Sequence, residues 1–246
     1  MSTLYLLGIG PGSQDHLTAA AKKALAESEF VVGYTRYIKQ IENLLNGKEV
    51  YATGMRKERE RAAHALEQAR RGRTGSIVSS GDPCIYGAGG LLLEMATEDD
   101  FNLDLKITII PGITAALSAG SLLGAPLMND YVSISLSDLL TDRETIINRL
   151  HSAGKGDFVL ALYNPRSTKR REIFLSMIDI MLQYRKADTP VGVVTSAYRE
   201  EQEVIITSLA RLAEMEEKIS MNSIIIIGNS QTYTKGGYMI TPRGYF

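Results

Sequence analysis

The sequence of 246 residues predicts an α/β protein of two α/β domains. Three observations carry this prediction. Short apolar runs alternate with helical patterns through the first half, the second half is richer in strand candidates, and turns rich in glycine and proline follow three of the early strands. Alternation of this kind is typical of a mostly parallel sheet whose two faces are covered by helices.

The first half supplies five strand candidates and five helical patterns. The expected strands cover residues 3–10, 30–34, 49–54, 76–83 and 105–112. The expected helices cover residues 15–28, 35–46, 58–72, 86–98 and 113–124. Because ligands of such sheets bind at the carboxyl ends of the strands, we expect a ligand site at the turns that follow those ends.

The second half contains more expected strands and fewer expected helices than the first half. The expected strands cover residues 131–138, 157–164, 190–198, 203–212, 223–230 and 237–244. The expected helices cover residues 144–154 and 167–186, with a short helical stretch at 209–216. Four strand candidates with little helix among them indicate a mixed sheet. We therefore expect an N-terminal domain of residues 1–124 and a C-terminal domain of residues 125–246.

The charge balance argues against a nucleic acid or an anionic membrane as the main partner. Lysine and arginine number 27 against 28 acidic residues, for a net charge of −1. The start of the chain lacks the pattern of a signal peptide, and no apolar run reaches the length of a membrane span. A single cysteine, Cys84, excludes an internal disulfide. A reducing cytoplasm is the expected location.

Metal binding by the chain is not expected. The three histidines, His16, His64 and His151, lie far apart on different expected elements, and no metal-ligand spacing is present. One cysteine alone also excludes a zinc or iron–sulfur site made of several cysteines.

The first turn reads "GIGPG" at residues 8–12 and raises the question of a dinucleotide fingerprint. Its glycines are spaced at two, and Pro11 removes one backbone donor where a phosphate cradle needs free N–H groups. The turn therefore predicts close approach of the backbone to a ligand without a pyrophosphate.

Two further turns have a similar plan. In "SSGDPCIYG", Pro83 forces Asp82 toward extended geometry, although an acid near a helix start is also explained by the helix dipole alone. In "IIPGITAALSAG", Thr114 is a plausible helix cap and small residues follow it. Close helix packing alone would also explain those small residues.

Taken together, "GIGPG", "GDPCIYG" and "PGITAA" resemble the tetrapyrrole methylases, S-adenosylmethionine (SAM) methyltransferases of corrin and porphyrin pathways. The resemblance covers almost the whole chain. In the second half, "NDYVSISLSDLLT", "LYNPRS", "TPVGVV" and "MITPRGY" are similar to the precorrin-3B C(17)-methyltransferases of cobalamin biosynthesis, which also contract the macrocycle. Whether the substrate is precorrin-3B or its cobalt form, cobalt-precorrin-3, stays open.

The resemblance implies that SAM, the cofactor, lies folded in a cleft between the two domains, held mainly by backbone contacts. The implied cofactor residues are Pro11, Ser80, Gly81, Asp82, Ile85, Thr114, Ala115, Leu162, Tyr163 and Ala197. The substrate carries a rim of carboxylates, which arginine forks match. The expected substrate residues are Gly10, Tyr34, Arg36, Arg56, Ser135, Asn164 and Arg166, and Tyr37 is a further candidate to face the macrocycle.

Methyl transfer to an electron-rich ring needs proximity and orientation more than an activated side chain. No Ser-His-Asp or Cys-His set is recognisable in the sequence. Ring contraction invites a general acid or base, for which we take Asp138 with Ser137. Asp15, Asp82 and Glu60 are alternatives, of which Asp82 fits least because its neighbours indicate a role with SAM.

Other functions are weighed against this one. A Rossmann-type oxidoreductase would place an acid after the second strand, where Gly33 and Tyr34 stand instead. A binding module without activity does not explain three ligand-type turns. A methylase of another corrin position, of the precorrin-4 or precorrin-2 type, is the nearer alternative, and the diphthine pathway is another; "SLSDLLT" argues against both. Ribosomal RNA methylation is disfavoured because the chain lacks a basic charge balance. By family resemblance we expect a homodimer.

Overall fold

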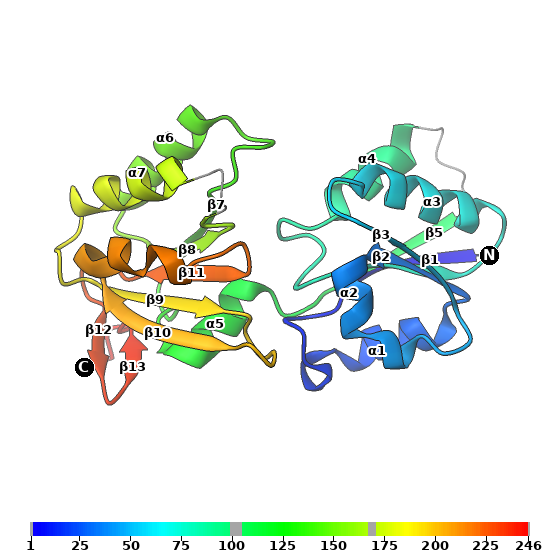
Figure 1. The fold of residues 1–246 in the computed structure, drawn as a ribbon, viewed down its shortest axis with the longest axis horizontal. Helices are drawn as coiled ribbons and strands as arrows, with labels where there is room; N and C mark the ends of the chain where they lie inside the picture. The colour runs from blue at the N-terminus through cyan, green and yellow to red at the C-terminus, as the bar shows by residue number, and fades with distance from the viewer. Residues whose placement is uncertain (1, 99–104, 167–170, 246) are drawn as a thin grey trace. The chain divides into compact units, whose positions relative to one another are not determined.

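The computed structural model describes residues 2–98, 105–166 and 171–245. It divides into two compact units, Met1–Thr114 and Ala115–Phe246 (Figure 1). The division falls at residue 114 and not at the expected residue 124, because helix α5 (Ala115–Leu123) packs in the second unit. There Ala116, Ala119 and Leu123 lie in one apolar cluster with strands of the second sheet.

The first unit contains the expected parallel sheet. Its strands are β1 (Ser2–Gly8), β2 (Phe30–Tyr34), β3 (Glu49–Thr53), β4 (Gly75–Ser79) and β5 (Leu105–Ile110). They lie in the order β3-β2-β4-β1-β5, and every pairing is parallel. The strand carboxyl ends therefore share one edge, where β4, β1 and β5 are neighbours.

Helices cover both faces of this sheet (Figure 1). The helices are α1 (Ala19–Glu27), α2 (Thr35–Gln40), α3 (Glu58–Arg70) and α4 (Gly89–Glu98), with short 3-10 turns η1 (Gln14–His16) and η2 (Glu42–Leu44). One apolar cluster joins α3 and α4 to one face, and a second joins α1, α2 and η2 to the other. The expected helix 35–46 is interrupted at Ile41, where α2 ends.

The second unit contains the expected mixed sheet. Its strands are β7 (Tyr131–Ser135), β8 (Val159–Tyr163), β9 (Pro190–Thr195), β10 (Glu203–Ser208) and β11 (Ser223–Ile227), in the order β10-β9-β11-β8-β7. The β7–β8 pair is parallel and the other pairs are antiparallel. Both β8 and β9 run opposite to β11, so β7, β8 and β9 end at the same edge.

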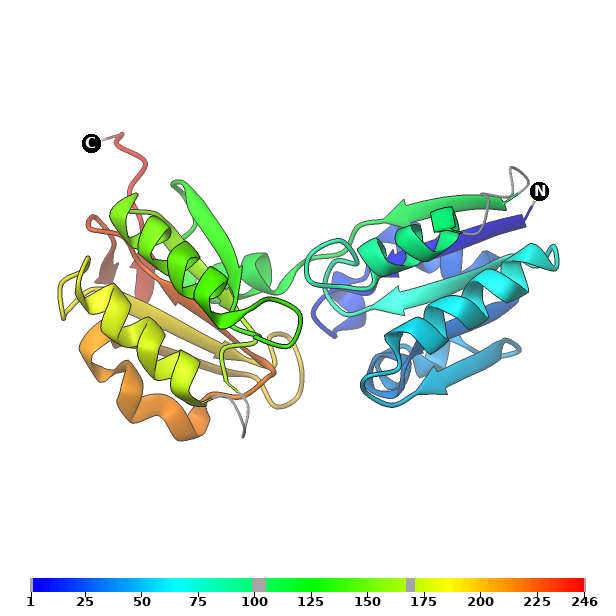
Figure 2. The same cartoon turned by 90° about the horizontal axis from the view of Figure 1, so that it is seen from above.

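Three helices lie side by side on one face of this sheet, α6 (Arg143–Lys155), α7 (Arg171–Leu182) and the 3-10 helix η3 (Leu209–Lys218) (Figure 2). Helix α5 covers the other face. The first four residues of the expected helix 167–186 lie outside the described residues. A small sheet of β6 (Gly124–Ala125), β12 (Tyr233–Lys235) and β13 (Tyr238–Ile240) completes the unit, and β6 and β12 were not expected.

Candidate active site

The three glycine-containing turns of the first unit meet at the ends of its central strands. The backbone N–H of Gly10 donates to the carbonyl of Gly81 at 3.1 Å, and the N–H of Gly81 donates back to Gly10 at 2.8 Å. The N–H of Ile9 also donates to the carbonyl of Ser79 at 2.9 Å. The turn after β1 is thus tied to the turn after β4 through backbone atoms alone.

The third turn, after β5, packs against the other two just as closely. A Cβ atom on Gly112 would lie 2.1 Å from the carbonyl oxygen of Gly81. A Cβ atom on Gly8 would lie 2.5 Å from the nitrogen of Gly112 and 2.7 Å from the Gly81 oxygen. Glycine is required at both positions because real Cβ atoms essentially never approach backbone so closely. The turns form a backbone surface with no lysine or arginine among residues 8–13, 80–86 and 111–115.

The Asp82 carboxylate fixes the second turn and joins it to the third. Its Oδ1 accepts from the N–H of Cys84 at 2.8 Å, and its Oδ2 accepts from the N–H of Gly112 at 3.1 Å. Burial, and secondly the negative charge of Asp82, raise the pKa of the Cys84 thiol. Cys84 is therefore a protonated thiol near neutral pH and is not poised as a nucleophile.

The expected cofactor residues of the first unit lie on these turns. Ser80, Gly81, Asp82 and Thr114 are half-buried, Pro11 is buried, and Ile85 is 42% exposed. The neighbouring Tyr86 is 53% exposed and has a left-handed φ of 52°. Such a conformation is uncommon outside glycine and is frequent at ligand sites. Gly10, an expected substrate residue, is buried in the first turn with φ 69°.

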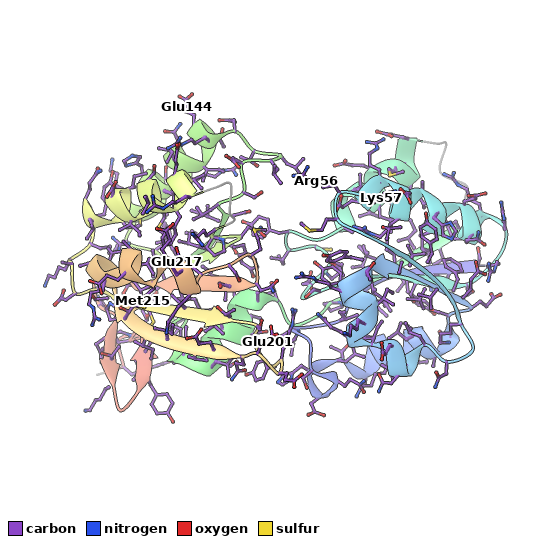
Figure 3. All side chains as sticks on the ribbon, in the orientation of Figure 1. Arg56, Lys57, Glu144, Glu201, Met215 and Glu217 are labelled. Carbon is purple, nitrogen blue, oxygen red and sulfur yellow. The ribbon has the colours of Figure 1, made fainter. Side chains whose placement is uncertain are left out.

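Other expected substrate residues lie at the same sheet edge, beyond β2 and β3. The rings of Tyr34 and Tyr37 meet edge to face at 5.1 Å between centroids. Arg36 and Arg56 are exposed, and Arg56 has a φ of 63°. Figure 3 shows Arg56 and Lys57 projecting from the loop between β3 and α3.

Arg61 is a residue of this region that the sequence analysis missed. It is 8% exposed, and its Nη1 donates to Thr53 Oγ1 and to the carbonyl of Gly54, both at 2.8 Å. Its guanidinium carbon also lies 6.0 Å from the Tyr34 ring centroid. Arg61 lies on the same helical face as Ala62, Ala65 and Ala69. A charged side chain on an apolar face needs hydrogen-bond or ionic partners, and this pattern in the sequence could have identified the residue.

Glu60, an alternative acid of the first unit, is engaged in hydrogen bonds within the fold. Glu60 accepts hydrogen bonds from Lys57 Nζ and from the Tyr51 hydroxyl, both at 2.7 Å. The bond from Lys57 is the largest cause that lowers the pKa of Glu60, followed by the bond from Tyr51. Glu60 therefore stays ionised and acts as a hydrogen-bond acceptor within the fold. Asp15 lies in η1 and is exposed.

The ends of β7 and β8 bring several second-unit candidates together. Asn164 Nδ2 donates to Ser135 Oγ at 3.0 Å, and Asn164 has a left-handed φ of 50°. The N–H of Leu136 donates to the Tyr163 carbonyl at 2.9 Å, and the N–H of Ser137 donates to Ser135 Oγ at 3.3 Å. Asp138 follows as an exposed residue. The segment after β7 is thus anchored to β8 beside Asn164.

Arg166 is engaged inside the protein, which its sequence position did not reveal. Its Nε lies 3.1 Å from Glu216 Oε1 and its Nη2 lies 3.6 Å from Glu217 Oε1. Arg171 Nε donates to the same Glu216 oxygen at 2.6 Å. The bond from Arg171 is the first cause that lowers the pKa of Glu216, and the charge of Arg166 adds to it. Glu216, on η3, joins the segment after β8 to the helical layer.

The remaining cofactor candidates, which belong to the second unit, differ in how deeply they are buried. Leu162 is fully buried with its side chain in the core beneath α6 and α7. Tyr163 is 9% exposed, and its hydroxyl accepts from the N–H of Ala116 at 3.0 Å. Ala115 and Ala197 are half-buried.

No group of three or more His, Cys, Asp or Glu side chains gathers as a metal site within residues 2–98, 105–166 and 171–245. Among the helices of those same ranges, none has the length and apolar character needed to cross a membrane.

A parallel sheet with ligand-type turns at the ends of its central strands places the first unit among the doubly wound α/β proteins. Residues 3–213 match the family model described as tetrapyrrole (corrin/porphyrin) methylases, and the chain belongs to this family.

Named relatives and a solved structure agree with this membership. A probable cobalt-factor III C(17)-methyltransferase of Salmonella typhimurium is 45% identical over 243 residues, covering 98% of this chain and 99% of that protein. A cobalt-factor III methyltransferase of Priestia megaterium is 43% identical over 98% of this chain, which spans only 45% of that longer protein. The crystal structure of the methyltransferase CobJ superposes with a TM-score of 0.92 at 34% identity, covering 98% of this chain and all of that one.

Proposed function

We propose that the protein is a SAM-dependent methyltransferase of cobalamin biosynthesis that methylates carbon 17 of a tetrapyrrole, with contraction of the ring. The observation that carries this proposal is the 45% identity, over nearly the full length of both chains, to the Salmonella protein named for that position. Relatives named for cobalt-factor III are 41% to 45% identical, whereas those named CobIJ are 34% identical. These identities favour a substrate that carries cobalt, and precorrin-3B is the alternative.

The turns of the first unit fit the proposed methyl donor. Their surface is mostly backbone, its exposed side chains include Ile85 and Tyr86, and it carries no cationic group for phosphates. This chemistry suits a nucleoside sulfonium that has polar edges and no phosphate. When bound, SAM supplies an electrophilic methyl group and leaves as the thioether S-adenosylhomocysteine.

The contribution of the chain to methyl transfer is then mainly orientation. Well-oriented groups lower a barrier by as much as about 7–11 kcal/mol in favourable cases. Rigid turns serve this purpose, and the contacts among Gly8, Gly81 and Gly112 leave the backbone little room to move. Asp138, exposed beside the anchored segment after β7, is the proposed proton-transfer group in ring contraction.

Carboxylates on the rim of the substrate need cationic partners. Arg36 and Arg56 have exposed guanidinium groups and are the preferred anchors. Arg166 shares Glu216 with Arg171, so we assign it chiefly to fixing the segment after β8. The homodimer and the cytoplasmic location stay predictions, the first of which light scattering would test.

The direct test is an anaerobic incubation of the purified protein with SAM and, in separate tubes, cobalt-factor III, cobalt-precorrin-3 and precorrin-3B. Mass and visible spectra would be read against tubes that lack SAM. We expect a gain of one methyl group with a spectral change in a cobalt tube. A gain only with precorrin-3B would contradict the cobalt assignment. No gain in any tube, despite binding of S-adenosylhomocysteine, would contradict the carbon-17 assignment.

A further inference from the structure

Two tyrosine hydroxyls hold helix α5 against the second sheet. Tyr163, the last residue of β8, accepts from the N–H of Ala116 at 3.0 Å, near the start of the helix. Tyr198, in the loop after β9, lies with its hydroxyl 2.7 Å from Ser121 Oγ, near the end of the helix. Because Ser121 Oγ donates its one proton to the Ser118 carbonyl at 2.9 Å, the Tyr198 hydroxyl is the donor in this bond.

The rest of the α5 interface is apolar packing against the second sheet. Ala116 and Ala119 are at most 1% exposed and pack on the apolar side chains of β8, β9 and β11. Leu123 is also fully buried in this cluster and packs over Gly192 of β9, so apolar contacts hold the end of the helix. The two hydrogen bonds, one toward each end, add to this packing a directional restraint on the helix.

The loop that carries Tyr198 holds its backbone under strain. Ser196 has a φ of 50° and Tyr198 a φ of 57°, so the two residues that flank Ala197 are both left-handed. Non-glycine residues keep this conformation only where surrounding contacts enforce it, and such strain gathers at ligand sites. Asn164, directly after Tyr163, is left-handed as well. Strained residues therefore follow both β8 and β9, which end at the same sheet edge.

Three hydrogen bonds enforce the strained loop. The N–H of Ser196 donates to the Asn222 carbonyl at 3.2 Å, and the N–H of Arg199 donates to the Ser196 carbonyl at 3.0 Å. The N–H of Tyr198 donates to Gln202 Oε1 at 2.8 Å. Ala197 is thus fixed from both sides, and the Tyr198 ring connects it to α5.

We propose that Tyr198 is a positioning residue whose hydrogen bond to Ser121 fixes the distance between Ala197 and the start of α5 at Ala115. This inference rests on the proposed function, in which Ala115 and Ala197 contact the methyl donor. The bond holds Ala115 and Ala197 at a fixed distance from each other. The donor therefore meets a preformed surface, and no loop has to become ordered on binding.

The test is a double-mutant cycle on the affinity for S-adenosylhomocysteine, measured by calorimetry with the full chain. The variants are Tyr198→Phe, Ser121→Ala and the two combined. We expect each single change to weaken binding about two- to tenfold, the worth of one neutral hydrogen bond. The combined variant should be no weaker than either single one, since both remove the same bond. The KM for SAM should rise while the KM for the tetrapyrrole stays unchanged.

Tyr184→Phe is the matched control. Its hydroxyl also bonds to a side chain, His151 Nδ1, at 3.0 Å, and Tyr184 lies in the same unit, where it joins the segment just after α7 to α6. Affinity in Tyr198→Phe equal to that in Tyr184→Phe, with a similar fall in melting temperature, would overturn the proposal. If Tyr198→Phe fails to fold, Ser121→Ala decides alone, and unchanged affinity overturns the inference. An unmutated protein that does not bind S-adenosylhomocysteine would overturn the proposed function itself.

Discussion

Asp82 and Gly112 are joined by a hydrogen bond of 3.1 Å from the glycine N–H to the aspartate Oδ2. The bond spans two turns that follow different strands, β4 and β5, and it makes them one body. The same carboxylate holds its own turn through the N–H of Cys84. Both oxygens of the Asp82 carboxylate are therefore bound by backbone N–H groups of the first unit.

Replacing Asp82 with alanine should loosen both turns. A hydrogen bond to a charged group contributes about 1.5–3 kcal/mol, so we expect the free energy of unfolding to fall by about that amount. Affinity for S-adenosylhomocysteine should fall with it, because the turns no longer form a rigid surface. Asp82→Asn keeps one acceptor oxygen, so its stability and its affinity should lie between those of Asp82→Ala and the unmutated protein. Thermal melts and calorimetry measure both effects, and an Asp82→Ala protein of unchanged affinity would contradict the role given to this bond.

Gly112→Ala should abolish binding of S-adenosylhomocysteine. Its Cβ would meet the Gly81 oxygen at 2.1 Å, so the turns must separate. The matched control is Gly90→Ala on α4, whose Cβ would meet nothing within 4 Å. Alanine is favoured over glycine inside a helix by about 1 kcal/mol, so this control should melt at a higher temperature with binding intact. Equal binding by both variants would show that the glycine contact is not needed.

Asp138→Asn should separate ring chemistry from cofactor binding. General acid–base groups contribute about 100-fold or more to rate, so we expect turnover to fall by at least that factor while affinity for S-adenosylhomocysteine is kept. Asp130→Asn, at the opposite end of β7, is the control and should keep full turnover. Unchanged turnover in Asp138→Asn would refute a proton-transfer role.

Glu216 should give the protein a pH-dependent contribution to stability. Its pKa in the folded state is lowered below the ordinary value of 4.5, first by the bond from Arg171 and then by the charges of both arginines. The ionised form is thus favoured by folding. The contribution is fully present above the ordinary value and is lost as the pH falls through the folded pKa.

Glu216→Gln should therefore melt at a lower temperature near neutral pH and should lose less stability than the unmutated protein on acidification from about pH 5 to 3. Glu217→Gln is the control, because its side chain is 91% exposed and exposed ion pairs contribute little. Thermal melts across this pH range give both comparisons. Parallel melting curves for Glu216→Gln and the unmutated protein would contradict the assignment.

The strands of the first unit were predictable because each is an apolar run bounded by glycine, proline or polar residues. The same periodicity could not reveal β6 or β12, which contain two and three residues. It also could not decide which sheet α5 covers. A helix of alanine, serine and glycine has the same local pattern against either sheet, and only its packing on β8 and β9 assigns it to the second unit.

The turns of the candidate site were predictable from local sequence, whereas contacts between residues far apart in the chain were not. Glycine and proline at the strand ends mark the three turns directly. In contrast, Glu216 lies 50 residues beyond Arg166, and nothing local indicates that the two meet. Arg166 was therefore expected among the substrate anchors, and its ion pair with Glu216 was not. Arg61 was missed for a related reason: only its partner Glu58 is local, and its other two acceptors, Thr53 and Gly54, lie at the end of β3.

The position of β1 sets the order in which the first unit can assemble. It precedes every other strand of its sheet along the chain, yet it lies between β4 and β5 in the finished sheet. Its partners are as remote as Leu4 with Gly75 and Ser2 with Leu105. Pairings so distant along the chain close slowly. A nascent chain therefore carries β1 unpaired until β4 emerges, and one edge of β1 stays open until β5 follows, so we expect more aggregation during expression than the finished fold would indicate.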